Sequence, residues 1–402
     1  MPHLRKRHAE PLLRKLLAFS PIVGVMGHRQ VGKTTLLEKV AEGYTTFDVR
    51  RERERADIDP QAFISGASRA PFAIDEAQLV PDLFPALKES VRINKKPGQF
   101  LLSGSVRFTA RKAIRESLTG RIVNLELLPM TQAEMDGRQP NAILSRALEA
   151  RSLVTIKGLI GRREEPASVD LIARYLKTGG LPGACFVRAD SLRAQKFESQ
   201  LETVLDRDLR LLVETRLPFR TLRNVLATLA LLQGQPLEIR ELSRRTRVSA
   251  PTLRNLLDAF EAMFLIRRLE TRGTEVRPVV FFEDQGEASH LAGRPVDSLT
   301  DLTRFLFSHL RSPLLLEAGG NTFFFQYRTR GGAYVPLCVE RGARGFLGII
   351  PILEENPGRQ ALASAASFTR KYVGAKVLFV HPYQSSAVLS DDLAVLPATS
   401  LA

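Results

Sequence analysis

One short segment constrains the fold of this 402-residue chain more than any other. It begins at Gly27 and ends at Thr34, with the pattern glycine, any four residues, then glycine-lysine-threonine. The segment lies between an apolar run at Ile22–Met26 and an amphipathic run at Thr34–Glu42, which predict a strand and a helix. A strand, a glycine loop and a helix in this order form a unit of a parallel α/β sheet. The segment therefore predicts an α/β fold.

The chemistry of this loop indicates nucleotide binding. Its glycines let the backbone turn tightly, so that successive N–H groups and the start of the helix face bound phosphates. Lys33 would reach the β and γ phosphates, and the hydroxyl of Thr34 would be a ligand of Mg²⁺. We therefore expect ATP and Mg²⁺ to bind here. The predicted binding residues are Gly27, His28, Arg29, Gln30, Val31, Gly32, Lys33, Thr34 and Thr35.

Two further strand ends carry residues suited to ATP hydrolysis. Asp75 and Glu76 directly follow the apolar run Phe72–Ile74. At a strand end facing the loop, Asp75 would hold Mg²⁺ and Glu76 would polarise the attacking water. Ser103 follows another apolar run at Gln99–Leu102 and would orient the water beside the γ-phosphate. Glu76 and Ser103 are therefore predicted catalytic residues, and Asp75 with Thr34 a predicted metal site.

Taken together, these stretches resemble a known family. The chain is similar to AAA+-type P-loop ATPases of bacteria and archaea in which the ATPase module precedes a C-terminal domain of unknown function. The matching stretches are Gly27–Leu36, Ala73–Gln78, Pro97–Ser105, Glu116–Arg121 and Leu125–Met130, with looser matches at Gly179–Pro182 and Asp206–Leu209. Ser103 stands where the family often has threonine, which keeps the hydroxyl.

The resemblance also implies a role for Arg121. In the family an arginine at this position stabilises charge on ATP in the transition state, so Arg121 is a candidate catalytic residue, acting in cis or from a neighbouring subunit. The alternative is an arginine that simply leads into the next strand, Ile122–Leu125. An arginine supplied by a neighbour would require a homo-oligomer, and the sequence does not decide this point.

The rest of the chain divides by its patterning into two more regions. Residues 1–150 are expected to form the AAA+ P-loop ATPase domain, with further strands at Tyr44–Asp48 and Ile122–Leu125 and a helix around Phe84–Val91. Residues 151–272 contain amphipathic runs at helical spacing and are expected to form a helical region. Residues 273–402 return to apolar runs, and strands are expected at Val279–Phe282, Thr322–Tyr327, Tyr334–Val339, Gly348–Ile352 and Ala375–Val380. With a helix at Arg359–Tyr372, these runs predict a C-terminal α/β domain.

Within the helical region, Leu237–Leu269 is similar to a winged helix. Leu237–Thr246 would be its first helix, Ser249 an N-cap, and Ala250–Met263 the recognition helix. A net charge of +15 favours polyanions such as DNA, although an arginine-rich proteome would give the same excess. Winged helices also serve as protein-packing modules, so DNA and a protein partner both remain open. The candidate DNA contacts are Arg244, Arg245, Arg247 and Arg254.

The C-terminal domain departs from the family. Relatives often carry a restriction-endonuclease-like core with metal-binding acids, but Pro336 stands where the first acid would be. The strand around Gly348–Ile352 likewise lacks an acid followed by a lysine. A metal nuclease needs carboxylates to hold Mg²⁺. We therefore expect a degenerate, nuclease-like fold without nuclease activity.

Composition places limits on the remaining functional classes. No apolar run approaches the roughly 20 residues of a membrane helix, and the basic N-terminus leads into an amphipathic run, so we expect a cytoplasmic protein. Cys185 and Cys338 lie far apart and are expected to be reduced thiols. Six scattered histidines indicate no structural metal site.

The leading functional hypothesis is an ATPase that couples its nucleotide state to the binding of DNA or of a partner. The alternative is a nucleotide-binding switch or scaffold that acts on a protein partner with little hydrolysis. A third hypothesis, an ATP-driven nuclease, is disfavoured by the missing carboxylates. The physiological substrate and the oligomeric state are not encoded in any recognisable motif.

Overall fold

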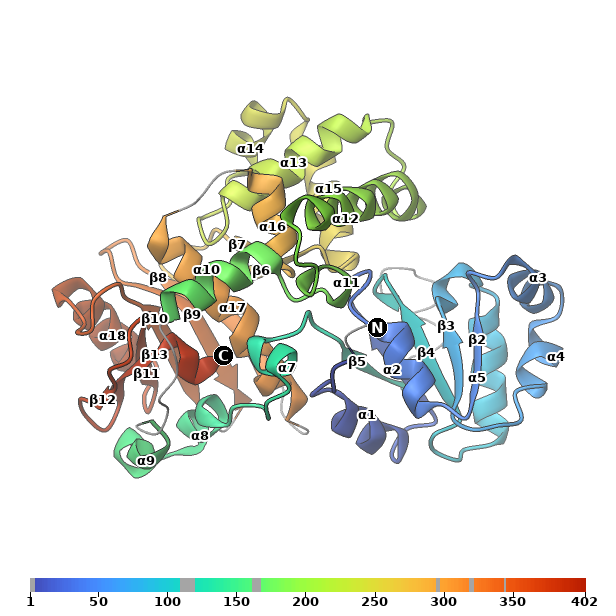
Figure 1. The fold of residues 1–402 in the computed structure, drawn as a ribbon, viewed down its shortest axis with the longest axis horizontal. Helices are drawn as coiled ribbons and strands as arrows, with labels where there is room; N and C mark the ends of the chain where they lie inside the picture. The colour runs from blue at the N-terminus through green and yellow to red at the C-terminus, as the bar shows by residue number, and fades with distance from the viewer. Residues whose placement is uncertain (1–3, 109–119, 161–167, 294–296, 318–321, 343–344) are drawn as a thin grey trace.

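The computed structural model describes residues 4–108, 120–160, 168–293, 297–317, 322–342 and 345–402. The described chain forms two β-sheets that lie side by side in Figure 1, and helices from the middle of the chain lie above them. This confirms the α/β class, with a five-stranded sheet from the N-terminal part of the chain and a second sheet from the C-terminal part.

The first sheet is wholly parallel and has the order β2-β3-β4-β1-β5. Its strands begin and end within one or two residues of the predicted runs, and the three inner strands are short, mostly buried and mainly apolar. The strands are β1 (Ile22–Met26), β2 (Gly43–Thr46), β3 (Phe72–Asp75), β4 (Phe100–Gly104) and β5 (Ile122–Glu126).

Helices cover both faces of this sheet. One face packs against α1 (Glu10–Leu17) and α2 (Lys33–Val40) through side chains such as Leu13 and Leu37. The other packs against α4 (Pro60–Ser65) and α5 (Leu83–Ile93). The charged run at Arg50–Arg55 lies on α3 (Arg50–Ile58), where Arg50 pairs with Glu54 on an exposed surface.

The middle of the chain is helical, as its periodicity predicts. Ser249 caps α15 by accepting a hydrogen bond from the amide of Thr252, which confirms the predicted N-cap. An antiparallel pair of strands, β6 and β7, follows α15. The helices are α7 (Gln132–Asp136), α8 (Ile143–Glu149), α9 (Lys157–Ile160), α10 (Ser168–Thr178), α11 (Pro182–Cys185), α12 (Asp190–Thr203), α13 (Phe219–Leu231), α14 (Ile239–Thr246) and α15 (Ala250–Ala262), with a π-helical turn at Val204–Asp208.

The second sheet is mixed and has the order β12-β13-β11-β10-β9-β8-β6-β7. Sequence patterning identified β7 to β11 and α18 but not β6, β12, β13, α16 or α17. The strands are β6 (Ile266–Gly273), β7 (Val279–Phe282), β8 (Thr322–Arg328), β9 (Tyr334–Arg341), β10 (Phe346–Pro351), β11 (Lys376–His381), β12 (Ala387–Val388) and β13 (Leu393–Pro397). The helices are α16 (Gln285–Ala292), α17 (Ser298–Leu316) and α18 (Arg359–Lys371).

Packing crosses both of the predicted domain boundaries. β6 pairs with β8 in parallel from Glu270 to Gly273, so the second sheet begins before residue 273. On the other side, Leu144 of α8 and Tyr175 of α10 share one apolar cluster with Phe305 of α17 and the C-terminal strands. The helical region is therefore packed against the second sheet. The domain ranges 1–150, 151–272 and 273–402 stay a prediction.

Candidate nucleotide site

The residues predicted for nucleotide chemistry meet at one edge of the first sheet. In the register of the sheet, Val25 lies opposite Ser103, and Thr46 lies opposite Asp75. Because all five strands run in parallel, the segments that follow β1, β3 and β4 emerge at the same edge. The glycine loop, the two acids and Ser103 are thereby brought together, as their strand-end positions predict.

The glycine loop needs both of its glycines. Gly32 has a φ of +98°, a left-handed conformation that glycine adopts without steric cost. At Gly27 a Cβ would lie 2.3 Å from the carbonyl oxygen of Leu127, so only glycine fits beside that chain. The helix α2 then begins at Lys33, which places its first N–H groups at the loop.

Lys33 points back into this loop. Its Nζ donates to the carbonyl oxygens of Gly27 at 3.1 Å and His28 at 3.0 Å, and only 5% of the residue is exposed. Burial lowers the pKa of this amine, against the opposing effect of Glu76 and Asp75. An anionic group bound in the loop would pair with this buried amine, which otherwise has only two carbonyl oxygens as partners.

Asp75 joins three hydroxyl groups. Its Oδ2 accepts hydrogen bonds from the Thr34 hydroxyl at 2.5 Å and the Tyr44 hydroxyl at 3.0 Å, while Oδ1 accepts one from Ser103. A carboxylate and a threonine hydroxyl in contact are hard oxygen ligands of the kind that Mg²⁺ prefers. The residues present therefore fit the predicted metal site. Tyr44 was not predicted, because a tyrosine at a strand start has no distinguishing pattern.

Glu76 follows Asp75 with a φ of +55°, which is uncommon outside glycine and turns the chain sharply at the strand end. Its backbone amide donates to the Ser103 hydroxyl at 3.1 Å, and its carboxylate accepts from the Ser105 hydroxyl at 3.2 Å and from Gln78. No role was predicted for Ser105 or Gln78. Their proximity to Glu76 depends on the turn, which the sequence does not reveal.

Arg121 does not join this group within one chain. It directly precedes β5, whose first residue Ile122 lies opposite Ile22 at the beginning of β1. Arg121 therefore lies at the sheet edge remote from the glycine loop. The family stretch that precedes it, Glu116–Thr119, falls outside the described residues.

Comparison with known proteins identifies this part of the chain. Residues 19–136 match the family model of the AAA domain. The first sheet and its glycine loop are an AAA domain. Residues 169–297 match a second model, which describes a domain of unknown function. The expected pairing of an AAA-type P-loop ATPase domain with a domain of unknown function is therefore confirmed.

Similarity extends over the whole chain in two mycobacterial proteins. The chain is 27% identical to an uncharacterized protein of Mycobacterium tuberculosis and to one of Mycobacterium bovis, over 99% of its own length and 85% of theirs. Among solved structures, a Walker-type ATPase of Pyrococcus abyssi is 15% identical, with a TM-score of 0.43 over 71% of this chain and 95% of its own. The replication initiator DnaA, bound to AMPPCP and single-stranded DNA, is 12% identical with a TM-score of 0.29, over 63% of this chain and 86% of its own.

The helical region reaches directly into the glycine loop of the AAA domain. Arg29 donates from Nη1 to Oδ2 of Asp208, at the end of the π-helical turn, at 3.1 Å. The neighbouring Arg207 contacts Asp48, which lies two residues beyond β2 at the same sheet edge. Asp206-Arg207-Asp208 matched the family only loosely in sequence. Arg29 belongs to the loop, and Arg207 lies next to it because both contact Asp208.

A second contact joins the loop to α16. The His28 ring lies with Nε2 3.1 Å from Oε2 of Glu287, and both side chains are fully buried. Asp284 caps α16 and also accepts hydrogen bonds from the amides of Gly180 at 2.7 Å and Leu181 at 3.2 Å. Burial raises the pKa of Asp284 to about 6. These contacts were not predicted, since His28 and Glu287 are 259 positions apart.

The N-terminal segment packs against the AAA domain next to the glycine loop. Arg7 donates to the carbonyl oxygens of Val31 and Leu128, each at 2.6 Å, and pairs with Glu134. Beside it lies a pocket of about 410 Å³ that reaches from Gly32 to Phe186. The predicted binding residue Thr35 lines this pocket, together with Leu36 and Met130. Its position next to the loop gives room for the base and sugar of a nucleotide.

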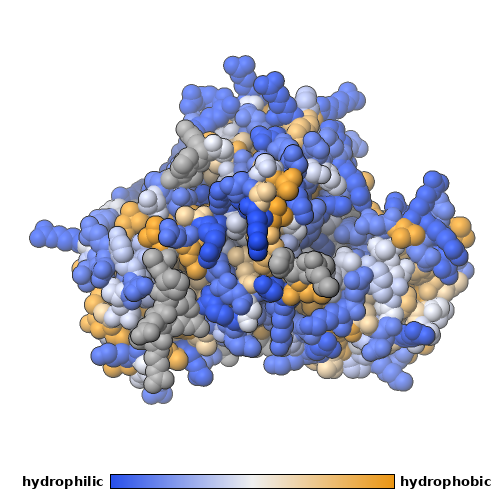
Figure 2. Space-filling model, in the orientation of Figure 1, coloured by the Kyte–Doolittle hydropathy of each residue, from blue (hydrophilic) through white to orange (hydrophobic). Residues whose placement is uncertain are grey.

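The four candidate DNA-contacting arginines are all exposed on the helical region. Arg244 and Arg245 both pair with Glu241 on the surface of α14. Arg247 ends α14 with a φ of +57°, and Arg254 lies on α15. The end of the molecule that carries α13 and α14 is covered mainly by hydrophilic side chains in Figure 2. The helix pair followed by β6 and β7 has the element order expected for a winged helix, and this assignment stays a prediction.

Other predictions from composition can be compared with the structure. Both Cys185 and Cys338 are free cysteines. Within the described ranges, no helix is long and apolar enough to cross a membrane, and no group of three or more His, Cys, Asp or Glu side chains is arranged to hold a metal ion.

Proposed function

We propose that the AAA domain binds and hydrolyses ATP and that the helical region couples its nucleotide state to nucleic acid. The observation that carries the proposal is the Asp75 carboxylate, which contacts the Thr34 hydroxyl on one side and the Ser103 hydroxyl on the other, directly before Glu76. These are the groups that phosphoryl transfer to water requires at one place: a metal ligand pair, a water-orienting hydroxyl and a base.

In this proposal, side chains of the chain bind the phosphates, hold the metal and accept the proton. Lys33 exchanges the carbonyl oxygens of Gly27 and His28 for phosphate oxygens when ATP binds. Mg²⁺, when bound, neutralises phosphate charge, and Thr34 and Asp75 would hold it. Glu76 accepts a proton from the attacking water, which Ser103 helps to orient.

Charge that develops on the γ-phosphate needs a guanidinium partner. Arg29 of the loop and Arg207 next to it lie within one chain, in contact with Asp208 and Asp48. Arg121 lies at the remote sheet edge, so in this proposal it contributes only from a neighbouring subunit of a homo-oligomer. The two arrangements are separable, because only the second makes hydrolysis depend on protein concentration.

Coupling would use the side chains that join the loop to the helical region. His28 contacts Glu287 and Arg29 contacts Asp208, so movement of the loop on ATP binding is transmitted to α16 and to the π-helical turn. The exposed arginines Arg244, Arg245, Arg247 and Arg254 would contact phosphates of DNA.

Steady-state hydrolysis of ATP in Mg²⁺ tests this proposal, with the wild type and Lys33→Ala compared with and without single-stranded and duplex DNA. We expect hydrolysis by the wild type, acceleration by one of the two DNA forms, and loss of both in Lys33→Ala. A wild type that binds ATP without turnover would favour the nucleotide switch instead. Turnover that is indifferent to DNA at low and high salt would refute the coupling to nucleic acid.

A further inference from the structure

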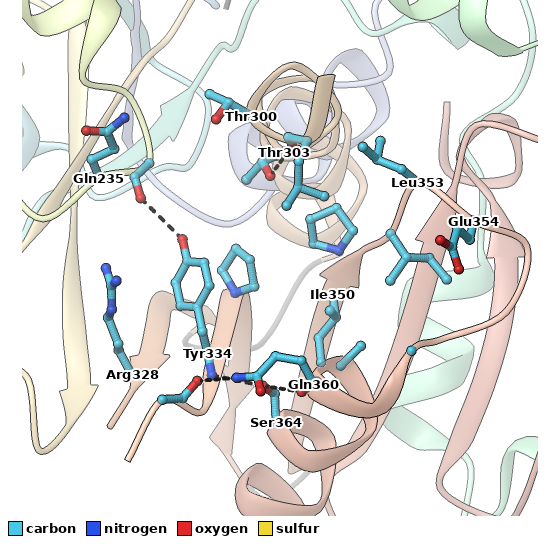
Figure 3. A pocket seen from close by; sticks show the side chains of 18 of the residues that line it. Gln235, Thr300, Thr303, Arg328, Tyr334, Ile350, Leu353, Glu354, Gln360 and Ser364 are labelled. Atoms are coloured by element: carbon cyan, nitrogen blue, oxygen red, sulfur yellow. Dashed lines mark hydrogen bonds between the residues drawn. The ribbon is translucent and has the colours of Figure 1, made fainter. Parts of the chain in front are cut away.

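A second cavity lies on the second sheet, at the facing ends of β9 and β10. It is a cleft of about 850 Å³ with walls from three parts of the chain (Figure 3). One wall is the segment Gln233–Pro236, which leads into α14, and a second is the first turn of α17. The third is formed by the facing ends of β9 and β10 with the start of α18. Its volume is in the range of ligand-binding clefts.

This cleft contains both positions at which the sequence lacks nuclease carboxylates. Pro336 of β9 lines it, and so do Ile350 and Pro351 of β10. The remaining acid on the lining is Glu354, which is exposed in the loop after β10. The two altered stretches thus form the floor of one cavity, in which apolar side chains replace acids. A cleft of this kind is suited to binding rather than to metal-dependent cleavage.

Hydrogen bonds between its walls hold the cleft open in a defined shape. The Tyr334 hydroxyl donates to the carbonyl oxygen of Gly234 at 3.2 Å, which connects β9 to the segment before α14. Gln360 of α18 donates to the carbonyl oxygen of Gly332 at 2.7 Å, and Ser364 accepts from the Tyr334 amide at 3.1 Å. The cavity is therefore preformed, which lowers the entropic cost of binding a ligand.

The lining favours flat, uncharged groups. Arg328 and Glu354 are its only charged side chains, so the net charge of the described lining is close to zero. Around the apolar floor lie neutral hydrogen-bonding groups, including Gln235, Thr303 and Asn356. Arg328 lies over the Tyr334 ring, with its guanidinium carbon 5.0 Å from the ring centroid. Among the residues that the structure describes, no carboxylate pairs with this guanidinium. A planar ligand can therefore extend the stack.

Charge is concentrated directly outside this cleft. Pro236 on the rim precedes α14 by only three residues, a span of at most about 11 Å in extended chain. α14 and the residues at its two ends carry four arginines, Arg240, Arg244, Arg245 and Arg247, against two acids. Of these acids, Glu238 is paired with Arg277 and Glu241 lies on α14 itself. A neutral, partly aromatic cleft beside a basic helix matches a ligand whose flat groups are neutral and whose backbone is anionic.

We propose that this cleft receives unstacked bases of single-stranded nucleic acid while the backbone phosphates follow α14. The bases stack on the Arg328 guanidinium and bind the amides and hydroxyls of the walls through their edges. An extended peptide would also meet an apolar floor and amides, but it offers no anionic backbone for α14. The inference rests on the nucleic-acid coupling proposed above and assigns it a site.

The test uses the full-length protein and a fluorescently labelled oligothymidylate, with binding measured by anisotropy in the absence of nucleotide. Arg328→Ala removes the stacked plane, whereas Arg330→Ala removes the same charge from an exposed position in the adjoining turn that does not line the cleft. Arg328→Lys keeps the charge and loses the plane. Ala361→Leu places a bulkier side chain that cannot stack with bases on the cleft wall, at the start of α18.

We expect Arg328→Ala and Arg328→Lys each to weaken oligothymidylate binding about tenfold, the usual loss for one stacking partner, and Ala361→Leu to weaken it by narrowing the cleft. Arg330→Ala should change the affinity by less than about twofold. Equal losses in Arg328→Ala and Arg330→Ala, or no loss in any variant, would overturn the proposal. Basal ATP turnover should stay unchanged in all four variants. Absent turnover in the wild type would therefore refute the ATPase proposal without affecting this result.

Discussion

The ring of His28 in the glycine loop and the carboxylate of Glu287 on α16 form a buried contact, with Nε2 3.1 Å from Oε2. Gln200 of α12 donates to the other oxygen of the same carboxylate at 3.2 Å. The AAA domain is thus joined to the helical region through the residue that follows the first glycine of its glycine loop. A change in this loop on nucleotide binding cannot leave the contact untouched, because every partner in it is buried.

This contact makes stability depend on pH. Burial alone lowers the pKa of His28, but the Glu287 carboxylate outweighs it and raises that pKa above 6.5. A histidine with a raised pKa stabilises the fold fully below about pH 6.5, and its contribution is lost as the pH rises through the folded-state pKa. Burial also raises the pKa of Asp284 to about 6. The stability of the fold therefore decreases further as the pH rises from the ordinary pKa of an aspartate to about 6.

Glu287→Gln should therefore lower the melting temperature most at pH 6 and least at pH 9. The glutamine keeps the hydrogen-bonding shape toward Gln200 and removes only the charge that holds the proton on His28. Thermal unfolding of wild type and variant across this range checks the prediction. A difference that grows toward pH 9 would show that His28 is neutral in the folded protein.

Arg207, which contacts Asp208 next to the loop, should matter for hydrolysis more than for nucleotide binding. Arg207→Ala is expected to reduce kcat for ATP by at least about tenfold, because a guanidinium near the γ-phosphate stabilises transition-state charge. The dissociation constant of a non-hydrolysable ATP analogue should change by less than about threefold. Kinetics and an equilibrium binding titration measure the two quantities separately.

Arg121→Ala is the matched comparison. Because Arg121 lies at the opposite sheet edge, it should affect hydrolysis only under conditions in which the protein assembles. Turnover per chain measured over a range of protein concentrations decides this point. A large, concentration-independent loss in Arg121→Ala, with normal turnover in Arg207→Ala, would reverse the assignment.

An ionic cluster fastens the AAA domain to the second sheet, with Arg311 and Glu283 buried and Glu126 and Arg267 partly exposed. Glu126, the last residue of β5, contacts Arg267 of β6 and Arg311 of α17, and both arginines also pair with Glu283. Burial alone would raise the pKa of Glu126, but the arginines lower it to about 2. Arg311→Met should cost about 3–5 kcal/mol in the free energy of unfolding, since it leaves the buried Glu283 carboxylate short of a partner.

Arg245→Ala provides the control for this measurement. Its ion pair with Glu241 lies on the surface, where the loss is expected to be at most about 1 kcal/mol. Denaturant unfolding of both variants gives the comparison. Similar losses in the free energy of unfolding of the two variants would show that the cluster stabilises the protein no more than a surface ion pair does.

Much of the first sheet could be predicted because its sequence is locally consistent. Its strands are short apolar runs, and parallel pairing then brings Thr34, Asp75 and Ser103 to one edge without further information. The region around α17 could not be predicted in the same way. Arg304, His309 and Arg311 are buried in that helix, which also contains Pro313, so the apolar periodicity that identifies a helix is interrupted.

The contacts of the glycine loop with the helical region could not be predicted either, for a related reason. Glu287 and Asp208 are acids with ordinary local surroundings, and their roles arise only from partners 259 and 179 positions away. Buried charges of this kind are stable only when paired, so their positions depend on the assembled fold rather than on local sequence.

Single-turnover hydrolysis by Glu76→Gln tests the central claim most directly. The account predicts that the variant binds ATP and Mg²⁺ with an affinity within about threefold of the wild type. It also predicts that the variant hydrolyses bound ATP at least about a hundredfold more slowly, as expected when a general base is lost. Hydrolysis at a rate near that of the wild type would contradict the assignment of Glu76 and of the site built around it.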